Sequence, residues 1–441
     1  MGENDPWDEE RRQPASLPRS LWAQISPPAP PTARAVEDAR VDVVIIGAGY
    51  TGLSAAIHLA QARVKIAVIE AAESGWGASG RNGGQVIPGL KIDPEDVLRV
   101  LGQERGKRIV EWAGAAPDLV FDLIRQFDID CSPVRNGWIQ PAYTKASLKI
   151  IESRCRQWQE RGAPVEMLDR AKLPEILGTP KYVGAWIDRR AGSINPLAYC
   201  RGLAKAALDV GATIFTSTPA KTLTRNGNLW NVATPDALFT ADHVIVATGA
   251  YCGDLVPGLR KTIAAVRLGE VATKPLNDEM LSKILPGRQP VSDWRRLLAS
   301  FRITPDGRLM MGGTTASSGP ETTAIRDSIH RAGRDLFGHF GALQWDYFWS
   351  GLFAVTTDKL PHLYEPQPNL LMALGCNGRG IALSTALGKV LAERVQGTAP
   401  QDLVLPVSAL EPIPFHFLYP PSMAIMVGWK GIQDRIDRAL S

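Results

Sequence analysis

The sequence predicts an α/β fold that begins with a βαβ unit on a parallel sheet, and three observations support this. Val41–Ile46 is an apolar, largely β-branched run, which is typical of a strand buried on both faces. Gly47, Gly49 and Gly52 follow in the spacing Gly-x-Gly-x-x-Gly, where the strand gives way to a helix. Glu70 ends a second apolar run, 18 residues after Gly52. This order is that of a Rossmann-like, dinucleotide-binding unit.

The glycines and the glutamate each have a physical role in such a unit. Gly47 makes the tight turn, Gly49 lets a pyrophosphate approach the backbone, and Gly52 lets the helix pack close to the strand. The helix that begins near Thr51 directs its N-terminal N–H groups at the phosphates. Glu70 is placed to accept hydrogen bonds from the ribose hydroxyls of an adenosine. The alternative is a glycine-rich turn in another kind of α/β unit.

A second glycine-rich stretch follows this unit. Residues 75–84, GWGASGRNGG, contain five glycines. Such a stretch is a poor helix or strand former, because glycine loses the most conformational freedom on folding. One interpretation is a flexible loop. The other is backbone held flat against a planar ligand, where side chains would collide.

The rest of the chain alternates between two kinds of sequence pattern. Helical patterns fill most of residues 94–180, with a hairpin predicted at Asn136-Gly137. Residues 184–250 again show the strand and helix pattern of residues 41–70. Residues 260–345 depart from this pattern, and a hairpin turn is predicted at residues 305–307. A buried strand, a glycine turn and a helix then follow over residues 370–395.

This interleaving predicts two domains. We expect a Rossmann-like domain formed by residues 41–90, 184–255 and 346–400. An α+β domain with a mixed or antiparallel sheet is expected for residues 91–183 and 256–345. Residues 1–40 are expected to form an extended, proline-rich leader that Trp22 anchors to the surface, and residues 401–441 a C-terminal extension.

Composition narrows the functional class. The chain has 441 residues, 45% of them hydrophobic, which is enough for two substantial cores. Its net charge of +4 comes from 49 basic and 45 acidic residues without long runs, so we expect no nucleic-acid or membrane-surface partner. The five cysteines are far apart, which argues against a disulfide framework, a metal site and a redox dithiol. We expect a cytoplasmic protein without a signal peptide or a transmembrane segment.

Four separated motifs together resemble the FAD-dependent D-amino-acid oxidase and glycine oxidase superfamily. They are Gly47-x-Gly49-x-x-Gly52, Glu70, Ala247-Thr248-Gly249 and Gly375-Cys-Asn-Gly-Arg-Gly380, within about residues 41–400. The loop Gly77–Gln85 is most similar to the γ-glutamylputrescine oxidoreductase branch. The resemblance implies an FAD domain built from three chain segments and a substrate domain whose sheet lies over the flavin.

The resemblance also implies, position by position, the residues that hold FAD. Those around the pyrophosphate and adenosine would be Gly47, Gly49, Tyr50, Thr51, Gly52, Glu70, Ala71, Pro219, Ala220, Thr248 and Gly249. Those along the ribityl chain and the isoalloxazine would be Ser79, Gly80, Asn82, Gly83 and Gly84. Those at the pyrimidine edge would be Asn377, Gly378, Arg379, Gly380 and Ile381, where a helix N-terminus would stabilise the anionic reduced flavin.

The sequence departs from the family pattern at three places. Gly351-Leu352 stands where some members attach FAD through a cysteine, so we expect non-covalent FAD. Phe353 replaces the arginine with which amino-acid oxidases pair the substrate carboxylate, and this favours an amine without a carboxylate beside the reacting carbon. A lysine found in sarcosine-oxidase-like members is replaced at Ile381-Ala382, which leaves the activation of oxygen unassigned.

The candidate residues of the substrate pocket are Gln85, Trp349, Phe353 and Arg379. Trp349 and Phe353 are more simply explained as core or flavin-packing residues. Arg379 has the simpler explanation of pairing with a phosphate or a surface acid. No catalytic residue is assigned, because the redox chemistry belongs to the flavin.

Three functions compete. The first is an FAD enzyme that oxidises a C–N bond by hydride transfer to flavin N5, followed by imine hydrolysis, with O2 or another electron acceptor. Its candidate substrates are γ-glutamylated amines and polyamines, and its alternative is an amino-acid oxidase or dehydrogenase. The second is a pyridine-nucleotide-dependent flavoprotein, which would need another Gly-x-Gly-x-x-Gly in mid-chain. The third is a non-catalytic flavin-binding protein, against which the loop at residues 77–84 argues.

Overall fold

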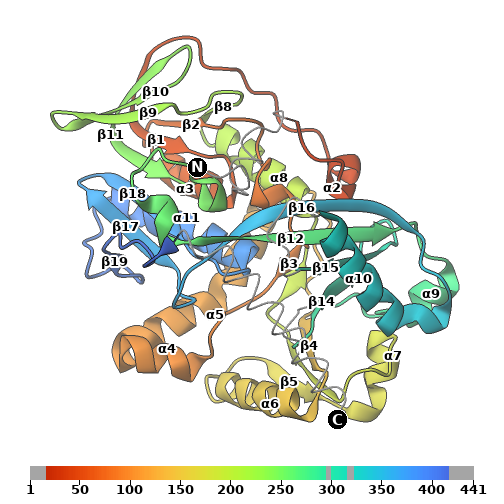
Figure 1. The fold of residues 1–441 in the computed structure, drawn as a ribbon. Coiled ribbons are helices and arrows are strands. Elements are labelled where there is room, and N and C mark those ends of the chain that lie inside the picture. The colour runs from red at the N-terminus through yellow and green to blue at the C-terminus, as the bar shows by residue number, and fades with distance from the viewer. Residues whose placement is uncertain (1–15, 295–298, 315–321, 417–441) are drawn as a thin grey trace.

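Two large β-sheets organise the chain. The computed structural model describes residues 16–294, 299–314 and 322–416. Within these ranges it contains a nine-stranded sheet, an eight-stranded sheet and the two-stranded ribbon of β3 (Gln85–Val86) and β7 (Gly192–Ser193). The nine-stranded sheet lies at the upper left of Figure 1, and the eight-stranded sheet crosses the centre and the lower right.

The predicted βαβ unit forms the middle of the nine-stranded sheet. β1 (Ala39–Ile46) lies between β11 (Leu238–Val246) and β2 (Ile66–Ile69), and both neighbours are parallel to it. β11 continues to β18 (Leu370–Leu374), and β2 continues to β8 (Thr213–Phe215), again in parallel. The apolar runs that predicted these strands are therefore buried on both faces, as parallel sheets require.

The remaining strands of this sheet lie at its edges. They are β9 (Thr222–Asn226), β10 (Leu229–Ala233), β17 (His362–Gln367) and β19 (Val407–Ser408). β9 and β10 form an antiparallel hairpin that turns at Asn226-Gly227. β19 belongs to the predicted C-terminal extension, so part of that extension joins the sheet. Residues 417–441 lie outside the described residues.

Three helices cover one face of β1. They are α3 (Tyr50–Gln61), α8 (Pro196–Asp209) and α11 (Gly380–Val395), which share a core with Val43 and Ile45. Val44 and Ile46 enter a second core on the opposite face. A β-carbon at Gly388 would lie 2.4 Å from the carbonyl oxygen of Thr51, so this glycine lets α11 approach α3 closely.

The eight-stranded sheet is mostly antiparallel. Its strand order is β16 (Trp345–Val355), β12 (Ala264–Thr273), β15 (Leu309–Gly313), β14 (Ala299–Ile303), β13 (Val291–Ser292), β4 (Trp138–Ala142), β6 (Gly184–Asp188) and β5 (Val165–Leu168). The hairpin predicted at residues 305–307 joins β14 to β15, and Gly307 has a φ of +78° in the turn. Besides α3, α8 and α11, the α-helices of the described residues are α2 (Leu21–Ile25), α4 (Pro94–Leu101), α5 (Gln103–Gln126), α6 (Lys145–Gln159), α7 (Leu173–Leu177), α9 (Asp278–Lys283) and α10 (Thr322–Phe337).

The structure corrects two predictions about strand pairing. The hairpin at Asn136-Gly137 is wrong, because Val134 bridges Ser193 whereas β4 pairs with β6 and β13. β6 and β16 were placed in the Rossmann-like segments, whereas both pair within the eight-stranded sheet. The pattern of a strand shows that it is extended and buried, but not which strand will lie beside it.

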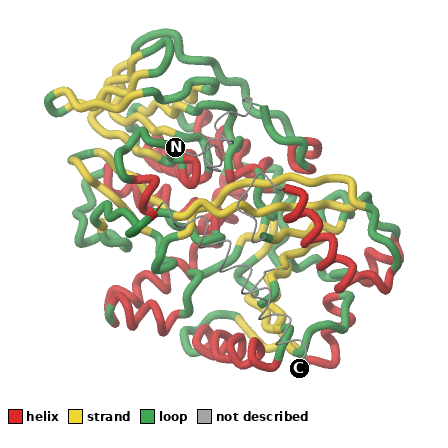
Figure 2. The backbone as a smooth tube through the Cα atoms, in the orientation of Figure 1, coloured by secondary structure: helices red, strands yellow, loops and turns green. Residues whose placement is uncertain are grey.

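The described part of the leader, residues 16–40, is held by Trp22, the residue predicted to anchor it, and residues 1–15 lie outside the described residues. Trp22 is fully buried, and its indole Nε1 donates to the carbonyl oxygen of Asn82 at 2.9 Å. Its ring packs edge-on against Trp349 of β16, with centroids 6.2 Å apart. Ala33 adds a bridge to Phe215 at the edge of the first sheet. The described part of the leader thus runs from one sheet to the other, and Figure 2 shows it as the short helix α2 followed by a loop. Within the described ranges, no helix is long and apolar enough to cross a membrane.

We predict that Trp22→Ala lowers the free energy of unfolding by about 3–5 kcal/mol, the range for removing a buried aromatic side chain. Denaturant titration followed by circular dichroism measures this loss. Val36→Ala is the control, because Val36 lies in the same leader and is 69% exposed, so it should change stability by less than about 0.5 kcal/mol. Equal unfolding midpoints for the two variants would contradict the packing described for Trp22.

Candidate functional site

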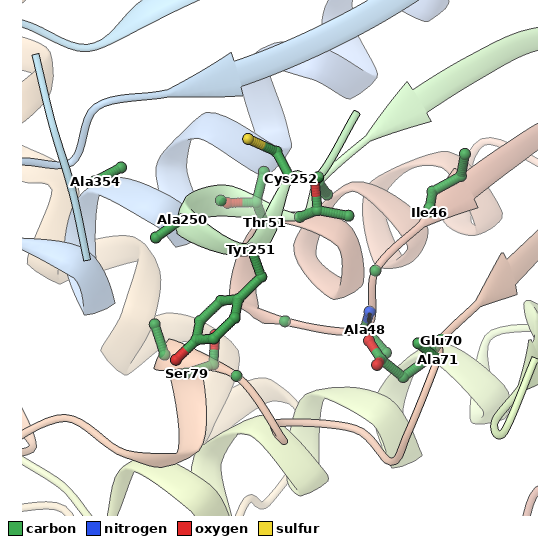
Figure 3. Close-up of a pocket in the computed structure, with 18 of the residues that line it drawn as sticks. Ile46, Ala48, Thr51, Glu70, Ala71, Ser79, Ala250, Tyr251, Cys252 and Ala354 are labelled. Atoms are coloured by element: carbon green, nitrogen blue, oxygen red, sulfur yellow. Dashed lines mark hydrogen bonds between the residues drawn. The ribbon is translucent and has the colours of Figure 1, made fainter. Parts of the chain in front are cut away.

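A cavity of 780 Å³ opens beyond the carboxyl ends of β1, β2, β11 and β18. Ligands of open α/β sheets bind at this edge. The predicted FAD-binding residues that line the cavity are Gly47, Gly49, Tyr50, Thr51, Glu70, Ala71, Ser79, Pro219, Ala220, Thr248 and Gly249. Figure 3 shows that they come from several segments that are distant in the sequence.

The turn from β1 to α3 has no room for side chains. A β-carbon at Gly47 would lie 2.8 Å from the carbonyl oxygen of Ala247, and one at Gly52 would lie 2.0 Å from that of Gly47. A β-carbon at Gly49 would lie 2.9 Å from Ser79 Oγ, which accepts a hydrogen bond from the backbone N–H of Tyr50 at 3.1 Å. Gly52 does not line the cavity; it allows the packing that shapes the turn.

Glu70 is held at the cavity wall by backbone donors. Its Oε2 accepts from the N–H of Ala48 at 2.8 Å, and its Oε1 accepts from the N–H of Ala72 at 3.0 Å. Burial raises the pKa of Glu70, while these N–H groups oppose the increase. Figure 3 shows Glu70 beside Ala48 and Ala71, at the end of the cavity where the ribose would bind.

One polar atom of the cavity wall has no protein partner. The hydroxyl Oγ1 of Thr248 is buried and makes no hydrogen bond among the described residues. Leaving a buried hydroxyl unpaired costs about 1–3 kcal/mol, a cost that a bound ligand removes. This unpaired atom, the backbone turn without side chains and the fixed carboxylate together fit a dinucleotide.

Hydrogen bonds fix the glycine-rich loop. Asn82 Nδ2 donates to the carbonyl oxygens of Ala78 at 3.1 Å and Ser79 at 3.0 Å, and its Oδ1 accepts from the N–H of Gly84 at 2.9 Å. From the second sheet, Arg302 Nη1 donates to the carbonyl oxygen of Gly84 at 3.0 Å. These bonds hold the backbone in one shape, which favours the planar-ligand interpretation over a flexible loop.

Four predicted FAD-binding residues of this loop do not line the cavity. A β-carbon at Gly80 would lie 2.2 Å from the carbonyl oxygen of Gly75, and one at Gly84 would lie 2.3 Å from that of Ile194. Asn82 bonds within the loop, and Gly83 faces the second sheet. Their direct contact with FAD therefore stays a prediction, while their packing supports the loop.

The turn before α11 reaches the cavity through residues other than the predicted ones, whose contact with FAD stays a prediction. Gly375 and Cys376 line the cavity, whereas Asn377, Gly378, Arg379, Gly380 and Ile381 do not. Asn377 is buried with a φ of +50°, and its Oδ1 accepts from the N–H of Thr356 at 2.9 Å. Arg379 Nη1 donates to the carbonyl oxygen of Pro88 at 2.5 Å, and its guanidinium lies 5.4 Å from the Trp138 ring centre.

Two of the remaining pocket candidates have structural partners. Gln85 Nε2 donates to the carbonyl oxygen of Val291 at 3.0 Å, and its Oε1 accepts from Ser292 Oγ at 2.7 Å, so it ties the loop to β13. Trp349 is 3% exposed, and its indole Nε1 donates to the carbonyl oxygen of Arg81 at 2.8 Å. Phe353 does line the cavity, together with the apolar residues beside it on β16.

Sequence reasoning missed part of the cavity wall. Tyr251 lines it, and its hydroxyl accepts from the N–H of Leu352 at 3.0 Å, which joins the wall to β16. Trp76 packs edge-on against Tyr251 with centroids 5.5 Å apart, and the Arg81 guanidinium lies 4.5 Å from the Trp76 ring centre. Tyr251 lies two residues after Gly249, so an aromatic residue just beyond that motif was the available signal.

The fold and the cavity together define a class of FAD-binding oxidoreductases. The chain belongs to the DAO family, described as FAD dependent oxidoreductase, which matches residues 42–394. The superfamily resemblance and the FAD cofactor predicted from the sequence are therefore confirmed.

Individual relatives fit this assignment. The chain is 30% identical to the probable oxidoreductase OrdL of Haemophilus influenzae, over 81% of this chain and 83% of that protein. It is 29% identical to gamma-glutamylputrescine oxidoreductase of Escherichia coli, over 82% and 85%. The crystal structure of glycine oxidase from Geobacillus kaustophilus shares the fold, with a TM-score of 0.69 and 23% identity, over 82% of this chain and 95% of that one.

We predict that Gly49→Val abolishes FAD binding, because the added side chain would meet Ser79 and fill the space where the pyrophosphate approaches the backbone. Cys376→Ser is the control, since it is nearly isosteric and lies at the same cavity. The measurement is the ratio of flavin absorbance to protein after purification. A normal ratio in the valine variant would show that the pyrophosphate binds elsewhere.

Proposed function

We propose that this protein oxidises the C–N bond of an amine, with non-covalently bound FAD as the oxidant. Bound FAD would supply the chemistry, by accepting a hydride from the carbon beside the nitrogen. The imine would then hydrolyse to a carbonyl compound and an amine. O2 or another electron acceptor would reoxidise the cofactor.

The observation that carries this proposal is the apolar segment of β16 at the cavity. Leu352, Phe353 and Ala354 all line the cavity, and none of them can pair with a carboxylate. An apolar wall excludes water and lowers the pKa of an amine, because desolvation disfavours the ammonium form. The neutral amine is the form whose neighbouring C–H bond can be oxidised.

We assign the two sheets different tasks in this reaction. The nine-stranded sheet, with α3 and α11, would hold FAD, and the eight-stranded sheet would cover the flavin and select the substrate. The backbone N–H groups at the start of α11 would supply positive potential for the anionic reduced cofactor. The division of the chain into these two tasks is supported by the cavity, which lies at the edge of the first sheet and takes β16 of the second as a wall.

Two arginines near the site, Arg302 and Arg379, are candidates for binding a carboxylate of the substrate. Arg302 is 1% exposed and its Nη1 lies within hydrogen-bond distance of the carbonyl oxygens of Gly84 and Ile194, so it supports the loop rather than a substrate carboxylate. Arg379 is partly exposed and is the candidate for a distant anionic group. We therefore propose amines that lack an α-carboxylate, with γ-glutamylated amines and polyamines as candidates. The name of the Escherichia coli relative supports the first of these.

The cellular location belongs to the same proposal. All five cysteines are free thiols, four of them buried. A reduced compartment keeps thiols in this form. We accordingly propose that the protein acts in the cytoplasm.

We predict that acid precipitation of the purified, yellow protein releases all of its FAD. The reason is that Gly351 and Leu352 offer no side chain for attachment. Cys252 and Cys376 do line the cavity, which makes the measurement informative. Flavin fluorescence that stays with the denatured polypeptide on a gel would contradict non-covalent binding, and Cys252→Ser and Cys376→Ser would then locate the link.

We predict that amines are better substrates than their α-carboxylated analogues. Suitable pairs are putrescine with ornithine and cadaverine with lysine, compared by kcat/KM. The absence of a charge-assisted partner at Phe353 removes about 1.5–3 kcal/mol of carboxylate binding, which corresponds to about ten- to a hundredfold. A preference for the amino acids throughout, lost in Arg379→Ala, would instead identify an amino-acid oxidase that uses Arg379.

A further inference from the structure

One carboxyl group on the second sheet has no assigned role. Glu270 lies on β12, opposite Trp349 of β16 and Gly312 of β15. Directly opposed residues of antiparallel strands share a face, so Glu270 lies on the face that also carries Trp349. That face meets the glycine-rich loop, because Trp349 donates to the carbonyl oxygen of Arg81. Glu270 therefore lies on the side of the sheet that faces the predicted isoalloxazine site.

Glycines make room for this carboxyl group. A β-carbon at Gly312 would lie 2.4 Å from Glu270 Oε2, and one at Gly83 would lie 3.0 Å from Oε1. The carboxyl group thus fills the space between β15 and the loop where two side chains would otherwise be. Gly83 is among the residues expected to lie along the flavin, so Glu270 reaches the same part of the loop.

The carboxyl group is buried but not satisfied. Glu270 is 2% exposed, and its Oε2 has no hydrogen-bond partner among the described residues. Its surroundings are apolar, with Met310, Ala272 and Trp349 in one buried cluster. An unpaired buried acceptor of this kind costs about 1–3 kcal/mol, and more when it is charged. A ligand that brings a donor to Oε2 would recover this cost.

Only one charged neighbour influences Glu270 among the described residues. Burial raises its pKa to about 8, and Arg302 of β14 opposes the increase. The other elements against the carboxyl group present Gly312 and Met310 from β15, Trp349 from β16 and Gly83 from the loop, none of which titrates. α10 packs on the opposite face of the sheet, where it contacts Gly269.

We propose that Glu270 receives the ammonium group of the substrate and removes one proton from it, so that the amine is neutral when it is oxidised. This inference rests on the proposed amine oxidation and adds the residue that handles the proton. The unpartnered Oε2 of Glu270 and the place of this carboxyl group beside Gly83 carry it. The ligand class that Glu270 selects is a cationic amine.

The proton step balances without a further reagent. The carboxylate of Glu270 takes one proton from R–CH2–NH3+, which leaves R–CH2–NH2 and a neutral carboxylic acid. The N–H bond breaks, an O–H bond forms, and no electrons leave the substrate in this step. Bound FAD would supply the later oxidation of the neutral amine, as the proposed function already requires.

The pH dependence of kcat/KM separates this role from a structural one. With Glu270, the reactive pair is a carboxylate and an ammonium ion. We therefore expect kcat/KM to rise as the carboxyl group ionises near pH 8 and to fall as the free amine loses its proton near pH 10. In Glu270→Gln only the neutral amine can react. Its kcat/KM should be about a hundredfold lower at neutral pH and should rise continuously toward pH 10.

Binding gives a readout that does not depend on turnover. The probe is tert-butylamine, which has no hydrogen on the carbon beside its nitrogen and cannot be oxidised. At pH 9, between the two pKa values, ionised Glu270 should bind the ammonium ion with little net proton release. The glutamine variant should release about one proton, because it must take the neutral amine. Calorimetry in two buffers of different ionisation enthalpy measures the difference.

The controls keep the outcomes distinct. Glu166→Gln changes an exposed carboxylate on β5, at the far edge of the sheet, and should leave every measurement unchanged. FAD content and thermal midpoint establish that Glu270→Gln is folded, and Glu270→Met, which also lacks a titratable group, replaces it if FAD is lost. An unchanged bell-shaped profile in the glutamine variant would overturn the role of Glu270. If the wild type oxidises no amine, the proposed function fails instead.

Discussion

The turn from β1 to α3 is the constraint on which the rest of the structure depends. Because no β-carbon fits at Gly47 or Gly52, α3 lies close against β1 and its N-terminus is open to a ligand. Gly388 likewise has no room for a β-carbon, and this glycine lets α11 pack against α3. The helices α3 and α11, which are far apart in the sequence, thus begin near the same cavity. The parallel strands that end at this edge of the sheet form the rest of its wall. A bulkier turn would separate these parts.

The second sheet is joined to this framework through the glycine-rich loop. Arg302 binds carbonyl oxygens of the loop from below, Trp22 of the leader donates to Asn82, and Gln85 bonds to β13. The loop and the adjoining Gln85 therefore have partners on the leader and on the second sheet. Loss of one partner would affect both the packing of the sheets and the surface offered to FAD. This arrangement explains why a stretch so rich in glycine is ordered without regular secondary structure.

The polarity of the site follows from what each sheet contributes. The first sheet supplies backbone donors and one fixed carboxylate, Glu70, which suit a dinucleotide. The second sheet supplies an apolar wall around Phe353. Its Glu270, which does not line this cavity, carries an oxygen without a hydrogen-bond partner among the described residues. In the amine oxidation that we propose, the apolar wall would favour the neutral amine and Glu270 would accept its proton, so the two features are chemically compatible. Under the same proposal, neither feature would bind a carboxylate at the reacting carbon.

The sequence by itself determined the elements whose signal is local. The strand, glycine turn, helix, strand and Glu70 of the first unit, the buried strand before Gly375, and the hairpin at 305–307 all follow from spacing and residue type. Tertiary structure alone decided which strands pair, as at Asn136-Gly137, and where single side chains lie. Trp22 at the loop, Tyr251 at the cavity and Glu270 beside Gly83 depend on contacts between residues far apart in the chain. A local pattern reports how a segment folds, whereas such contacts arise only when packing brings separate segments together.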